Sequence, residues 1–488
     1  MVRLKYVVLS LFLLPCMPDS MKAQNRYDVL RYVSSLPGSD AVTSAYGGAS
    51  TALGTGLGSV SDNPAVLGMI KQSSFNIGFN NRRIQEQAFF GGSDLYLNQA
   101  TTTLSDAGFI YNMPTVQGSF VFGASYSKIT DFLRGYQIFG YNNQTTLTDG
   151  FSDPNSQYYD LAYRKAYFDV QEGDVSIFRL APFAGINQDV QQTEKGQLGE
   201  FNVYSSFEAA ENLFVGASIS IPFGFYRYQR FFLEEDTKGL YFGEFFVEYP
   251  DGNTYFDDVR EIFTLDEIDA TITGLYARLG VAYKVKPWLN LGLSYRTPTK
   301  MNVREDYLSS LEVNFDNGDF IGPEQLDGTV DYSVKNPGRL NIGAAVDNLN
   351  GFTLSGSMEF IPYSTSELSF KNANSTDIAY QRDQNRQIAS EFNDVINIKL
   401  GLGYRLGAVE PVLGYSYYPA ISKEFGSDVA TYAGGFKIKM NSDISFNIAA
   451  MYSEFSDTQT VYQAINGSEN AALDSKKFQV TAGLVFRF

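Results

Sequence analysis

Histidine does not occur in this chain, and cysteine and tryptophan occur once each among its 488 residues. The absence of histidine excludes Ser-His-Asp and Cys-His catalysis and histidine-ligated metal sites. Cys16, the only cysteine, can form neither an internal disulfide nor a thiolate cluster. Catalysis would have to depend on carboxylates or lysines alone, so we expect no enzyme activity, no metal and no cofactor.

Long apolar runs and positive charge are also scarce. No stretch after the N-terminus reaches the 18 or so apolar residues that a membrane helix needs. The chain has 37 Lys and Arg against 54 Asp and Glu, a net charge of −17, which disfavours nucleic acid as a partner. Phenylalanine (39), tyrosine (33) and glycine (44) are abundant, which favours many strands with ample apolar surface to bury and argues against disorder.

The N-terminus has the pattern of an export signal. Arg3 and Lys5 supply positive charge, residues 6–14 supply a short apolar core, and a small-residue exit follows near Ala23. We therefore expect residues 1–23 to be a signal peptide. Cys16 allows a second interpretation as a lipoprotein cysteine, although Pro15 is a poor match to the small residue preferred before such a site.

Strict alternation along the second half of the chain predicts strands with two different faces. In the C-terminal segment one face carries only apolar or small residues, namely Phe478, Val480, Ala482, Leu484, Phe486 and Phe488. The segment from Ile396 to Arg405 alternates in the same way. A soluble sandwich and an outer-membrane barrel both produce this pattern, so the connections have to separate them.

The connections favour a barrel. We expect fourteen strands, joined alternately by turns of a few residues and by longer loops, the longest at 131–195 and 231–267. Tight turns at one rim and long loops at the other are typical of an outer-membrane barrel. The sequence therefore predicts an all-β fold, a 14-stranded antiparallel transmembrane β-barrel, with strands near 73–83, 104–113, 117–130, 196–209, 213–230, 268–285, 289–305, 328–346, 350–370, 393–406, 409–420, 428–440, 443–456 and 476–488.

Three segments resemble the FadL-type outer-membrane transporters of long-chain fatty acids and other hydrophobic compounds. Residues 45–53 form a small-residue run, and Asn63-Pro64-Ala65 closes it with a turn just before the first strand. The other two segments are Gly292 to Pro298 and Asn336-Pro337 with Arg339-Leu340.

The resemblance implies an N-terminal hatch (residues 24–72) that closes the lumen of a barrel (residues 73–488). It implies passive uptake of hydrophobic compounds such as fatty acids or hydrocarbons, with lateral exit into the outer membrane of a Gram-negative bacterium. The partners would be these small molecules, the membrane lipid and the barrel-assembly machinery. An alternative is a FadL-like barrel that binds a secretion or surface protein, and a membrane-embedded hydrolase is disfavoured by the missing histidine.

The run GTGLGS at residues 54–59 lacks the spacing, strand and helix of a dinucleotide site. In a hatch, its small side chains would let an irregular backbone pack closely against strands, and a mobile exported leader is the simpler alternative. The predicted hatch residues are Gly47, Gly48, Gly54, Gly56, Gly58, Asn63, Pro64 and Ala65.

A set of charged residues falls on the face predicted to line the lumen: Arg296, Arg339, Glu359, Lys399, Arg405, Lys437, Lys439 and Arg487. These residues either form an anion path or pair with acids of the hatch such as Asp62, and we favour the pairing. A basic ladder would also attract a carboxylate head group.

Three further features of the sequence allow more than one interpretation or a structural expectation. A helix near 156–170 would place Tyr158, Leu161, Ala162 and Ala166 on one stripe, either as a ligand groove or as a cover over the barrel mouth. Phe478, Phe486 and Phe488 match a terminal signal for barrel assembly or an ordinary last strand. Acidic clusters, including Glu234 to Asp236, lack the spacing of a calcium loop and are expected to be solvated.

Overall fold

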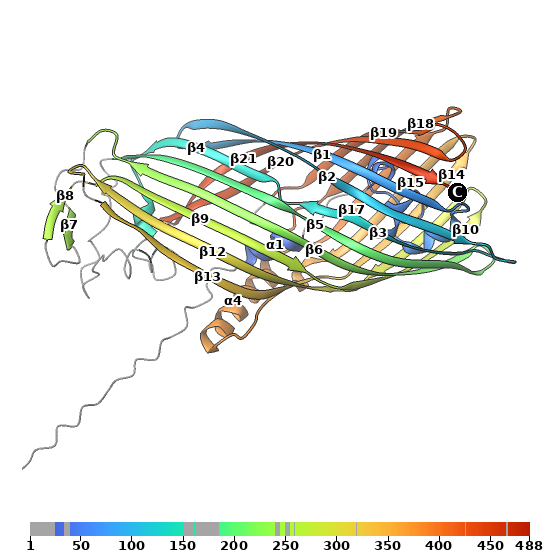
Figure 1. The fold of residues 1–488 in the computed structure, drawn as a ribbon, viewed down its shortest axis with the longest axis horizontal. Coiled ribbons are helices and arrows are strands. Elements are labelled where there is room, and N and C mark those ends of the chain that lie inside the picture. The colour runs from blue at the N-terminus through green and yellow to red at the C-terminus, as the bar shows by residue number, and fades with distance from the viewer. Residues whose placement is uncertain are drawn as a thin grey trace, which may run out of the picture.

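The computed structural model describes residues 25–33, 40–150, 158, 161, 185–239, 245–248, 254–257, 259–318, 320–424, 426–464 and 467–488. Within these ranges, 19 strands form one antiparallel sheet. β1 (Ser74–Phe90) pairs with both β2 (Ser93–Met113) and the last strand, β21 (Gly467–Arg487), so the sheet closes into a barrel. Figure 1 shows a long tube whose C-terminus lies at one end.

The wall has fourteen strand positions, which confirms the predicted 14-stranded antiparallel transmembrane barrel. The strands that fill a position alone are β1, β2, β5 (Ile186–Ala210), β6 (Leu213–Glu235), β17 (Asp394–Tyr404), β18 (Val409–Tyr418), β19 (Val429–Lys439), β20 (Ile444–Ala464) and β21. The other positions are divided between β3 (Phe120–Asp131) and β4 (Arg134–Asn142), β9 (Val259–Thr273) and β10 (Tyr276–Lys286), β11 (Leu289–Arg296) and β12 (Thr299–Phe315), β13 (Phe320–Asn336) and β14 (Arg339–Leu349), and β15 (Phe352–Pro362) and β16 (Glu367–Phe370).

β17 shows how the sequence separates the two faces of the wall. Its apolar residues from Ile396 to Tyr404 are exposed, whereas the alternate residues, including Asn397 and Lys399, are buried inside. Exposed apolar side chains facing outward and polar side chains facing inward are the arrangement of a membrane barrel, because lipid rather than water surrounds the wall.

The outward apolar band occupies only the half of the barrel that carries the tight turns. On β1, Phe75 and Phe79 are 42% and 55% exposed, but the next outward residues are Asn81 and Arg83. On β17 the band ends at Ile396, since the next outward residue is Asp394. The remaining strand length therefore projects beyond the outer face of the membrane, as predicted for strands longer than the 9–11 residues that cross a bilayer.

The prediction of long loops at the outer rim was wrong in several places. Residues 84–103, 306–318, 320–327, 457–464 and 467–475 continue the paired strands, and the segments 131–195 and 231–267 include β4, the start of β5 and much of β9. Above the membrane the outward face carries polar residues such as Gln85 and Gln87, and the inward face mixes apolar and polar ones such as Ile84 and Glu86. The contrast that marks the membrane-crossing part is therefore lost although the strand continues. A two-stranded ribbon, β7 (Phe245–Glu248) with β8 (Thr254–Asp257), and η3 (Leu147–Gly150) complete this end.

Four neighbouring positions are interrupted near the outer edge of the band. The interruptions lie at 274–275, 297–298, 337–338 and 363–366, the last containing η5 (Tyr363–Thr365). Pro298 and Pro337 fall in two of them, where a residue without an N–H costs the ladder no hydrogen bond.

The helical segments lie mainly before β1. They are α1 (Arg26–Val33), α2 (Ala41–Ala45), η1 (Leu57–Ser61) and η2 (Pro64–Met69), and α4 (Ser375–Glu391) follows β16. In Figure 1 the blue N-terminal segment lies within the tube and α4 projects from its side. No helix in the described ranges is long and apolar enough to cross a membrane.

Candidate functional site

Residues 40–70 lie inside the tight-turn half of the barrel and touch its wall on several sides. α2 packs against β18 to β21, η1 against β2 and β3, and η2 against β5, β6 and β10. Asp40 caps α2 by accepting a hydrogen bond from the Thr43 N–H at 2.7 Å. Nearly all of the segment is buried, so its helical turns fill the lumen at this level.

The glycines of this segment are needed for its conformation and packing. Gly47, Gly48 and Gly56 have φ values of 63°, 81° and 135°, which side chains other than glycine rarely adopt. At Gly58, an added Cβ would overlap Thr43 and the Asp40 carboxylate, and the Gly58 N–H donates to that carboxylate. The donor that a phosphate would need is therefore already used by an acidic side chain of the chain itself. An added Cβ at Gly54 would lie 3.0 Å from the Val66 carbonyl oxygen.

Asn63, Pro64 and Ala65 form the turn that fixes η2 to the wall. The Asn63 side chain accepts from the Ala65 N–H at 3.0 Å and donates to the carbonyl oxygens of Thr51 at 2.8 Å and Val281 at 3.1 Å. It thus joins two parts of the segment to β10. Pro64 occupies the first position of η2, which suits its fixed φ.

A belt of inward-facing wall glycines, which the sequence reading did not single out, lets the segment approach the strands. An added Cβ would lie under 3.0 Å from residues 45–65 at each of Gly216, Gly280, Gly292, Gly343, Gly401 and Gly414. At Gly401 it would lie 2.5 Å from Cδ1 of Tyr46. The signal was present in the sequence, because these glycines all occupy the inward phase of their strands.

Buried charges also connect the segment to the wall. Lys399 Nζ lies 3.4 Å from Asp62 Oδ1 and 3.7 Å from Glu359 Oε2, and Arg339 Nη1 lies 3.7 Å from Glu359 Oε1. All four side chains are at most 13% exposed. The arrangement is a chain of alternating charges from the segment to β14, in keeping with the pairing interpretation.

The other predicted lumen charges lie elsewhere. Arg296 is buried and donates to Asn336 Oδ1 at 2.9 Å and to the Pro337 carbonyl oxygen at 3.1 Å. Lys437 lies 2.8 Å from Glu410, which also accepts from the Tyr46 hydroxyl at 2.7 Å. Three residues lie at the tight-turn rim and not deep in the lumen, so they do not continue a ladder: Arg405, which is 49% exposed, Lys439 and Arg487.

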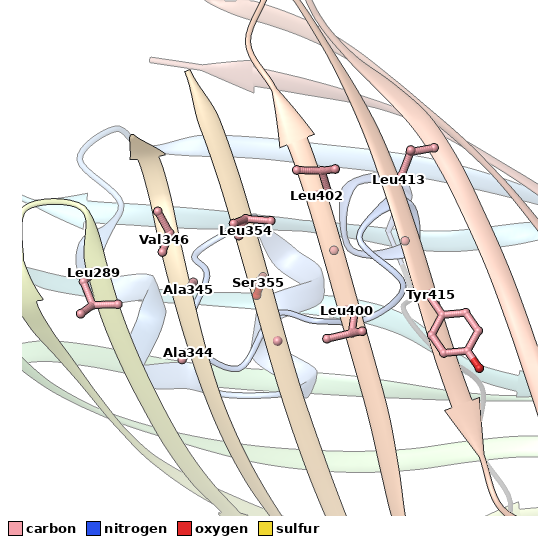
Figure 2. Close-up of a pocket in the computed structure, with 13 residues that line it drawn as sticks. Leu289, Ala344, Ala345, Val346, Leu354, Ser355, Leu400, Leu402, Leu413 and Tyr415 are labelled. Atoms are coloured by element: carbon pink, nitrogen blue, oxygen red, sulfur yellow. The ribbon is translucent and has the colours of Figure 1, made fainter. Parts of the chain in front are cut away.

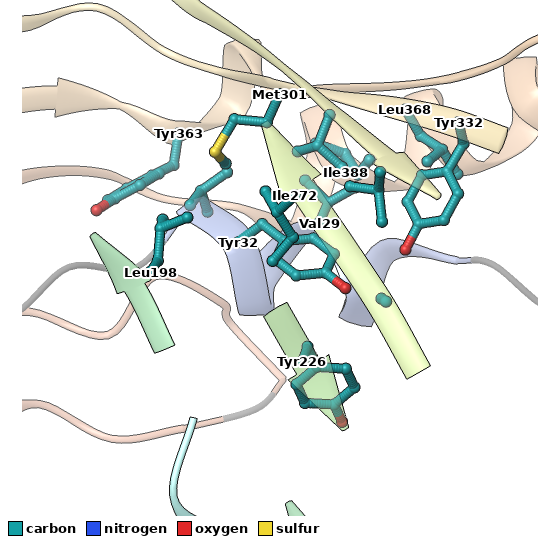
Figure 3. Close-up of a cluster of buried hydrophobic side chains, with 14 of the residues drawn as sticks. Val29, Tyr32, Leu198, Tyr226, Ile272, Met301, Tyr332, Tyr363, Leu368 and Ile388 are labelled. Atoms are coloured by element: carbon teal, nitrogen blue, oxygen red, sulfur yellow. The ribbon is translucent and has the colours of Figure 1, made fainter. Parts of the chain in front are cut away.

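Above residues 40–70, the hatch segment, the lumen is filled by one cluster of buried apolar side chains, and we call this part of the lumen the chamber (Figure 3). α1 occupies its centre. Tyr32 contacts Phe132 and Tyr226 edge to face, at ring centroid distances of 6.0 and 6.4 Å. The walls come from many strands and from α4, through Leu198, Ala270, Ile272, Met301, Val303, Val330, Tyr332, Val334, Ile361, Tyr363, Leu368, Phe370, Ile388, Phe392 and Val395.

The inner end of the chamber carries two buried arginines, Arg296 and Arg339, of which Arg339 is paired with Glu359. Arg339 Nη2 donates to the Val33 carbonyl oxygen at 3.1 Å, so this guanidinium binds the C-terminal end of α1. Arg296 lies on the neighbouring strand, opposite Arg339 in the β11–β14 ladder. An apolar chamber with cations at one end suits a molecule with an apolar body and an anionic or polar head.

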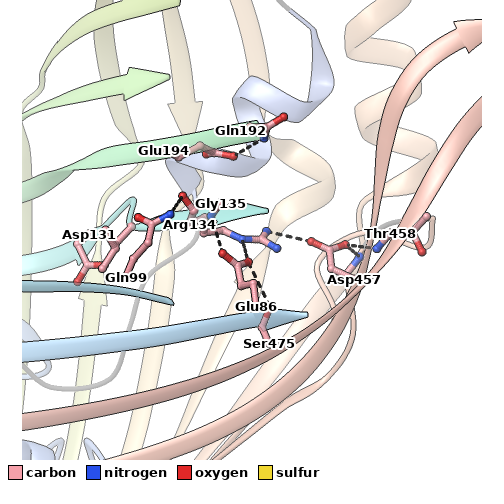
Figure 4. Close-up of polar contacts among 12 residues, drawn as sticks. Glu86, Gln99, Asp131, Arg134, Gly135, Gln192, Glu194, Asp457, Thr458 and Ser475 are labelled. Atoms are coloured by element: carbon pink, nitrogen blue, oxygen red, sulfur yellow. Dashed lines mark hydrogen bonds and ion pairs between the residues drawn. The ribbon is translucent and has the colours of Figure 1, made fainter. Parts of the chain in front are cut away.

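The wall has a break between β2 and β4. The ladder between β2 and β3 ends at Asp106↔Ser127, and β4 pairs with β5 only. Beyond the break, Arg134 lies between Glu86 at 3.1 Å and Asp457 at 3.0 Å (Figure 4). The Gly135 N–H donates to the same Glu86 carboxylate. These bonds hold β4 on the lumen side of the neighbouring strands of the wall.

The outer end of the tube is filled by a second apolar cluster, the outer cluster. It includes Phe90, Ile138, Phe232, Phe315 and Tyr462, together with Tyr158 and Leu161 from the predicted loop stripe. Tyr158 and Leu161 are 5% and 0% exposed, so they cover the mouth and do not line an open groove. Ala162 and Ala166 lie outside the described residues. Burial raises the pKa of the Tyr158 hydroxyl, which donates to Asp266 at 2.6 Å.

Glu234 corrects the expectation that the acidic loop clusters are solvated. It is fully buried and accepts from the Leu147 N–H at 2.7 Å and from Gln188 at 2.7 Å. It therefore ties η3 to β5 beneath the outer cluster. No group of three or more acidic or cysteine residues able to hold a metal occurs among the described positions.

An apolar groove on the wall lies on the lipid side. It is lined by Leu354, Leu400, Leu402, Leu413 and Tyr415 around the small residues Ala344 and Gly356, and the hatch segment runs behind it (Figure 2). These four leucines are 39–63% exposed, and Leu289 also lines the groove. The groove therefore faces outward and is separate from the chamber.

The terminal aromatic residues lie on the same outer wall. Phe478 is 44% exposed, Phe486 contacts Phe75 across the closing ladder at a ring distance of 6.4 Å, and Phe488 is 74% exposed. The Phe488 N–H donates to the Ser73 carbonyl oxygen at 3.1 Å. The last residue thus fastens the C-terminus beside the start of β1.

No family model matches the sequence, and no curated protein matches it either. The fold, in contrast, is similar to solved structures. The toluene transporter TodX of P. putida aligns over 93% of this chain and 99% of its own, with a TM-score of 0.57 and 14% identity. A Pseudomonas aeruginosa FadL homologue aligns over 93% and 99%, with a TM-score of 0.56 and 12% identity.

The toluene transporter TbuX of Ralstonia pickettii aligns over the same shares of the two chains, with a TM-score of 0.52 and 14% identity. These similarities cover 93% of this chain. The chain therefore has the fold of these FadL-type transporters, as the resemblance in its sequence predicts.

Proposed function

We propose that this protein is a passive channel for hydrophobic compounds such as long-chain fatty acids in the outer membrane of a Gram-negative bacterium. The observation that carries the proposal is the apolar chamber inside the barrel, closed below by the hatch segment and above by the outer cluster. A water-filled pore would instead be lined by polar side chains along its whole length. The solved structures with this fold include toluene transporters.

The hatch closes the route toward the tight-turn rim, so bound molecules leave through the wall. The break between β2 and β4 is the exit that the geometry favours, because Phe132, a chamber residue, lies in the two-residue link between β3 and β4. A lateral exit delivers an apolar molecule to lipid without passage through water. The cations Arg296 and Arg339 at the inner chamber end would hold a carboxylate head group.

The proposal is tested by identifying what the purified barrel carries. The protein is extracted in mild detergent and its contents are identified by mass spectrometry. Bound fatty acid or hydrocarbon supports uptake. A stoichiometric protein partner with an empty chamber would support a role in secretion or surface attachment instead.

A matched pair of variants assigns the bound molecule to the chamber. Ala270 on β9 is fully buried in the chamber, whereas its neighbour Thr271 points outward. Ala270→Phe fills chamber volume and is expected to lower the amount of ligand per barrel at least several-fold, with Thr271→Phe as the control. Heat-modifiable gel migration reports whether each barrel is folded. Equal ligand in both folded variants would contradict the chamber as the binding site.

A further inference from the structure

Among the residues that the structure describes, the hydrogen-bonded ladder of the wall is interrupted at one side above the outward apolar band, and we call this interruption the gap. The ladder between β19 and β20 ends at Ala430↔Glu454, although β20 continues to Ala464. On the other side, β13 pairs with β16 only over Tyr332 to Lys335, although β13 begins at Phe320. The strands between them, β17, β18 and β19, have 11, 10 and 11 residues, enough to cross the bilayer and no more.

α4 covers the lower part of this gap. Its Asn385 side chain accepts from the Leu368 N–H at 2.8 Å and donates to the Leu368 carbonyl oxygen at 2.9 Å, as a neighbouring strand would. Gln381 accepts from the Phe370 N–H at 2.9 Å. Two amide side chains thus replace a missing strand at the edge of β16. α4 is also held by buried Ile388 and by the pair of Arg26 with Glu391, but at the β16 edge it supplies side-chain bonds and no continuous ladder. A cover bound in this way detaches more easily than a paired strand.

α4 lies at the level where the wall meets the membrane surface. It ends at Glu391, three residues before Asp394, where the outward apolar face of β17 stops. Across the gap, Tyr452 is the last outward aromatic of β20 before Glu454. The gap therefore opens beside the head groups of the outer leaflet.

α1 runs from the gap across the whole chamber. At its outer end, Arg26 lies 2.7 Å from Glu391 of α4, and Tyr27 is 37% exposed. At its inner end, Tyr32 reaches Phe132 and Tyr226 on the opposite wall. The space between α4 and the opposite wall is thus wide enough for a helix, and Val29, Tyr32 and Val33 fill it with apolar side chains.

We propose that amphiphilic molecules with an apolar chain enter the chamber sideways from the outer leaflet, through the gap covered by α4, and take the space that α1 occupies. The mouth is an unfavourable entrance because the outer cluster fills it, with the ring centroids of Phe232 and Tyr462 5.6 Å apart. At the gap, an apolar chain passes from lipid to chamber without being exposed to water. This inference depends on the proposed uptake function and specifies where the molecule comes in.

The single tryptophan allows the route to be followed by fluorescence. In a Trp288→Phe background, three matched reporters are made: Phe370→Trp beneath α4, Phe132→Trp at the far chamber wall, and Phe232→Trp in the outer cluster. Each barrel is placed in lipid nanodiscs and mixed rapidly with a brominated fatty acid, which quenches tryptophan on contact. We expect quenching at positions 370 and 132 and none at 232. Quenching at 232 before or together with 132 would show entry through the mouth and overturn the proposal.

Loosening α4 tests the cover directly. Gln381→Ala with Asn385→Ala removes the side chains that bind β16, and quenching at position 132 is expected to become at least threefold faster. Arg382→Ala with Arg386→Ala alters exposed residues of the same helix and is the control, expected to leave the rate unchanged. An unchanged rate in the loosened variant would overturn the side entrance.

The failure of the proposed function has a different signature. If neither position 370 nor position 132 is quenched at saturating fatty acid while gel migration shows folded barrels, no such molecule reaches the chamber, and uptake itself is refuted. If position 132 is quenched but the quenching rate is the same with and without the substitutions in α4, the uptake function is supported and only the side entrance is refuted.

Discussion

Gly401→Ala on β17 is expected to displace the hatch segment from the barrel wall. The added methyl group would lie 2.5 Å from Cδ1 and 2.9 Å from Cβ of Tyr46, well inside normal contact distance. The same methyl would also lie 2.9 Å from the Tyr46 carbonyl oxygen, so a rotation of the ring alone does not relieve the overlap.

The magnitude follows from the cost of overpacking. One methyl group forced into a filled interior costs about 1–3 kcal/mol. If strain is relieved by displacement of the hatch, that cost changes the ratio of open to closed barrels by about 5- to 150-fold. Single-channel recordings in planar bilayers measure this ratio as the frequency and duration of openings.

Gly356→Ala on β15 is the matched control. Its added methyl would face outward, with Leu400 Cδ2 at 3.6 Å as its nearest neighbour, which is ordinary contact. We expect recordings indistinguishable from those of the unmodified barrel. If Gly401→Ala opened no more often than Gly356→Ala in a folded barrel, the glycine belt would not be what holds the hatch segment in place.

Three further outcomes are expected. Lys399→Met removes the ion-pair partner of buried Asp62, which keeps its hydrogen bond from the Ser50 hydroxyl. The substitution is expected to cost about 3–5 kcal/mol, measured as a lower urea midpoint. Lys335→Met breaks the exposed ion pair with Glu367 and should cost less than about 1 kcal/mol. Equal shifts of the urea midpoint in the two variants would refute the argument from burial. Tyr32→Ala removes a fully buried ring from the chamber and should release α1 at a cost of about 3–5 kcal/mol, seen as increased mobility of a spin label at position 25; an immobile label would contradict this. Phe488→Ala should reduce the yield of assembled barrel in cells while leaving its unfolding midpoint unchanged, because the ring is 74% exposed; a normal yield would remove the assembly role.

Alternation alone was enough to predict most of the membrane-crossing wall. The segment from Ile396 to Arg405 has apolar residues in one phase and polar or small residues in the other, and β17 has that geometry. The prediction stopped where the environment changed. Beyond Phe79, water lies outside the wall, so Asn81 and Arg83 take outward positions and the strand is no longer visible in the pattern.

The positions of the candidate site residues could not be read from the chain order. Asp62 and Lys399 are far apart in the sequence, and only the closure of the barrel brings them to 3.4 Å. The inward phase of Gly401 was readable, but the side chain that it accommodates, Tyr46, was not. Contacts of this kind depend on which turn of the hatch faces which strand, and no local pattern encodes that.

The sequence by itself determined the closed antiparallel wall, its membrane-facing surface and the small-residue segment before it, because these depend on periodicity and residue size. Tertiary structure alone decided that the lumen holds an apolar chamber around α1, that the outer mouth is filled, and that the wall opens beside α4. Those features arise where strands of unequal length meet. The unpaired strand edges and the inward apolar side chains there are contacted by segments that are distant in the sequence.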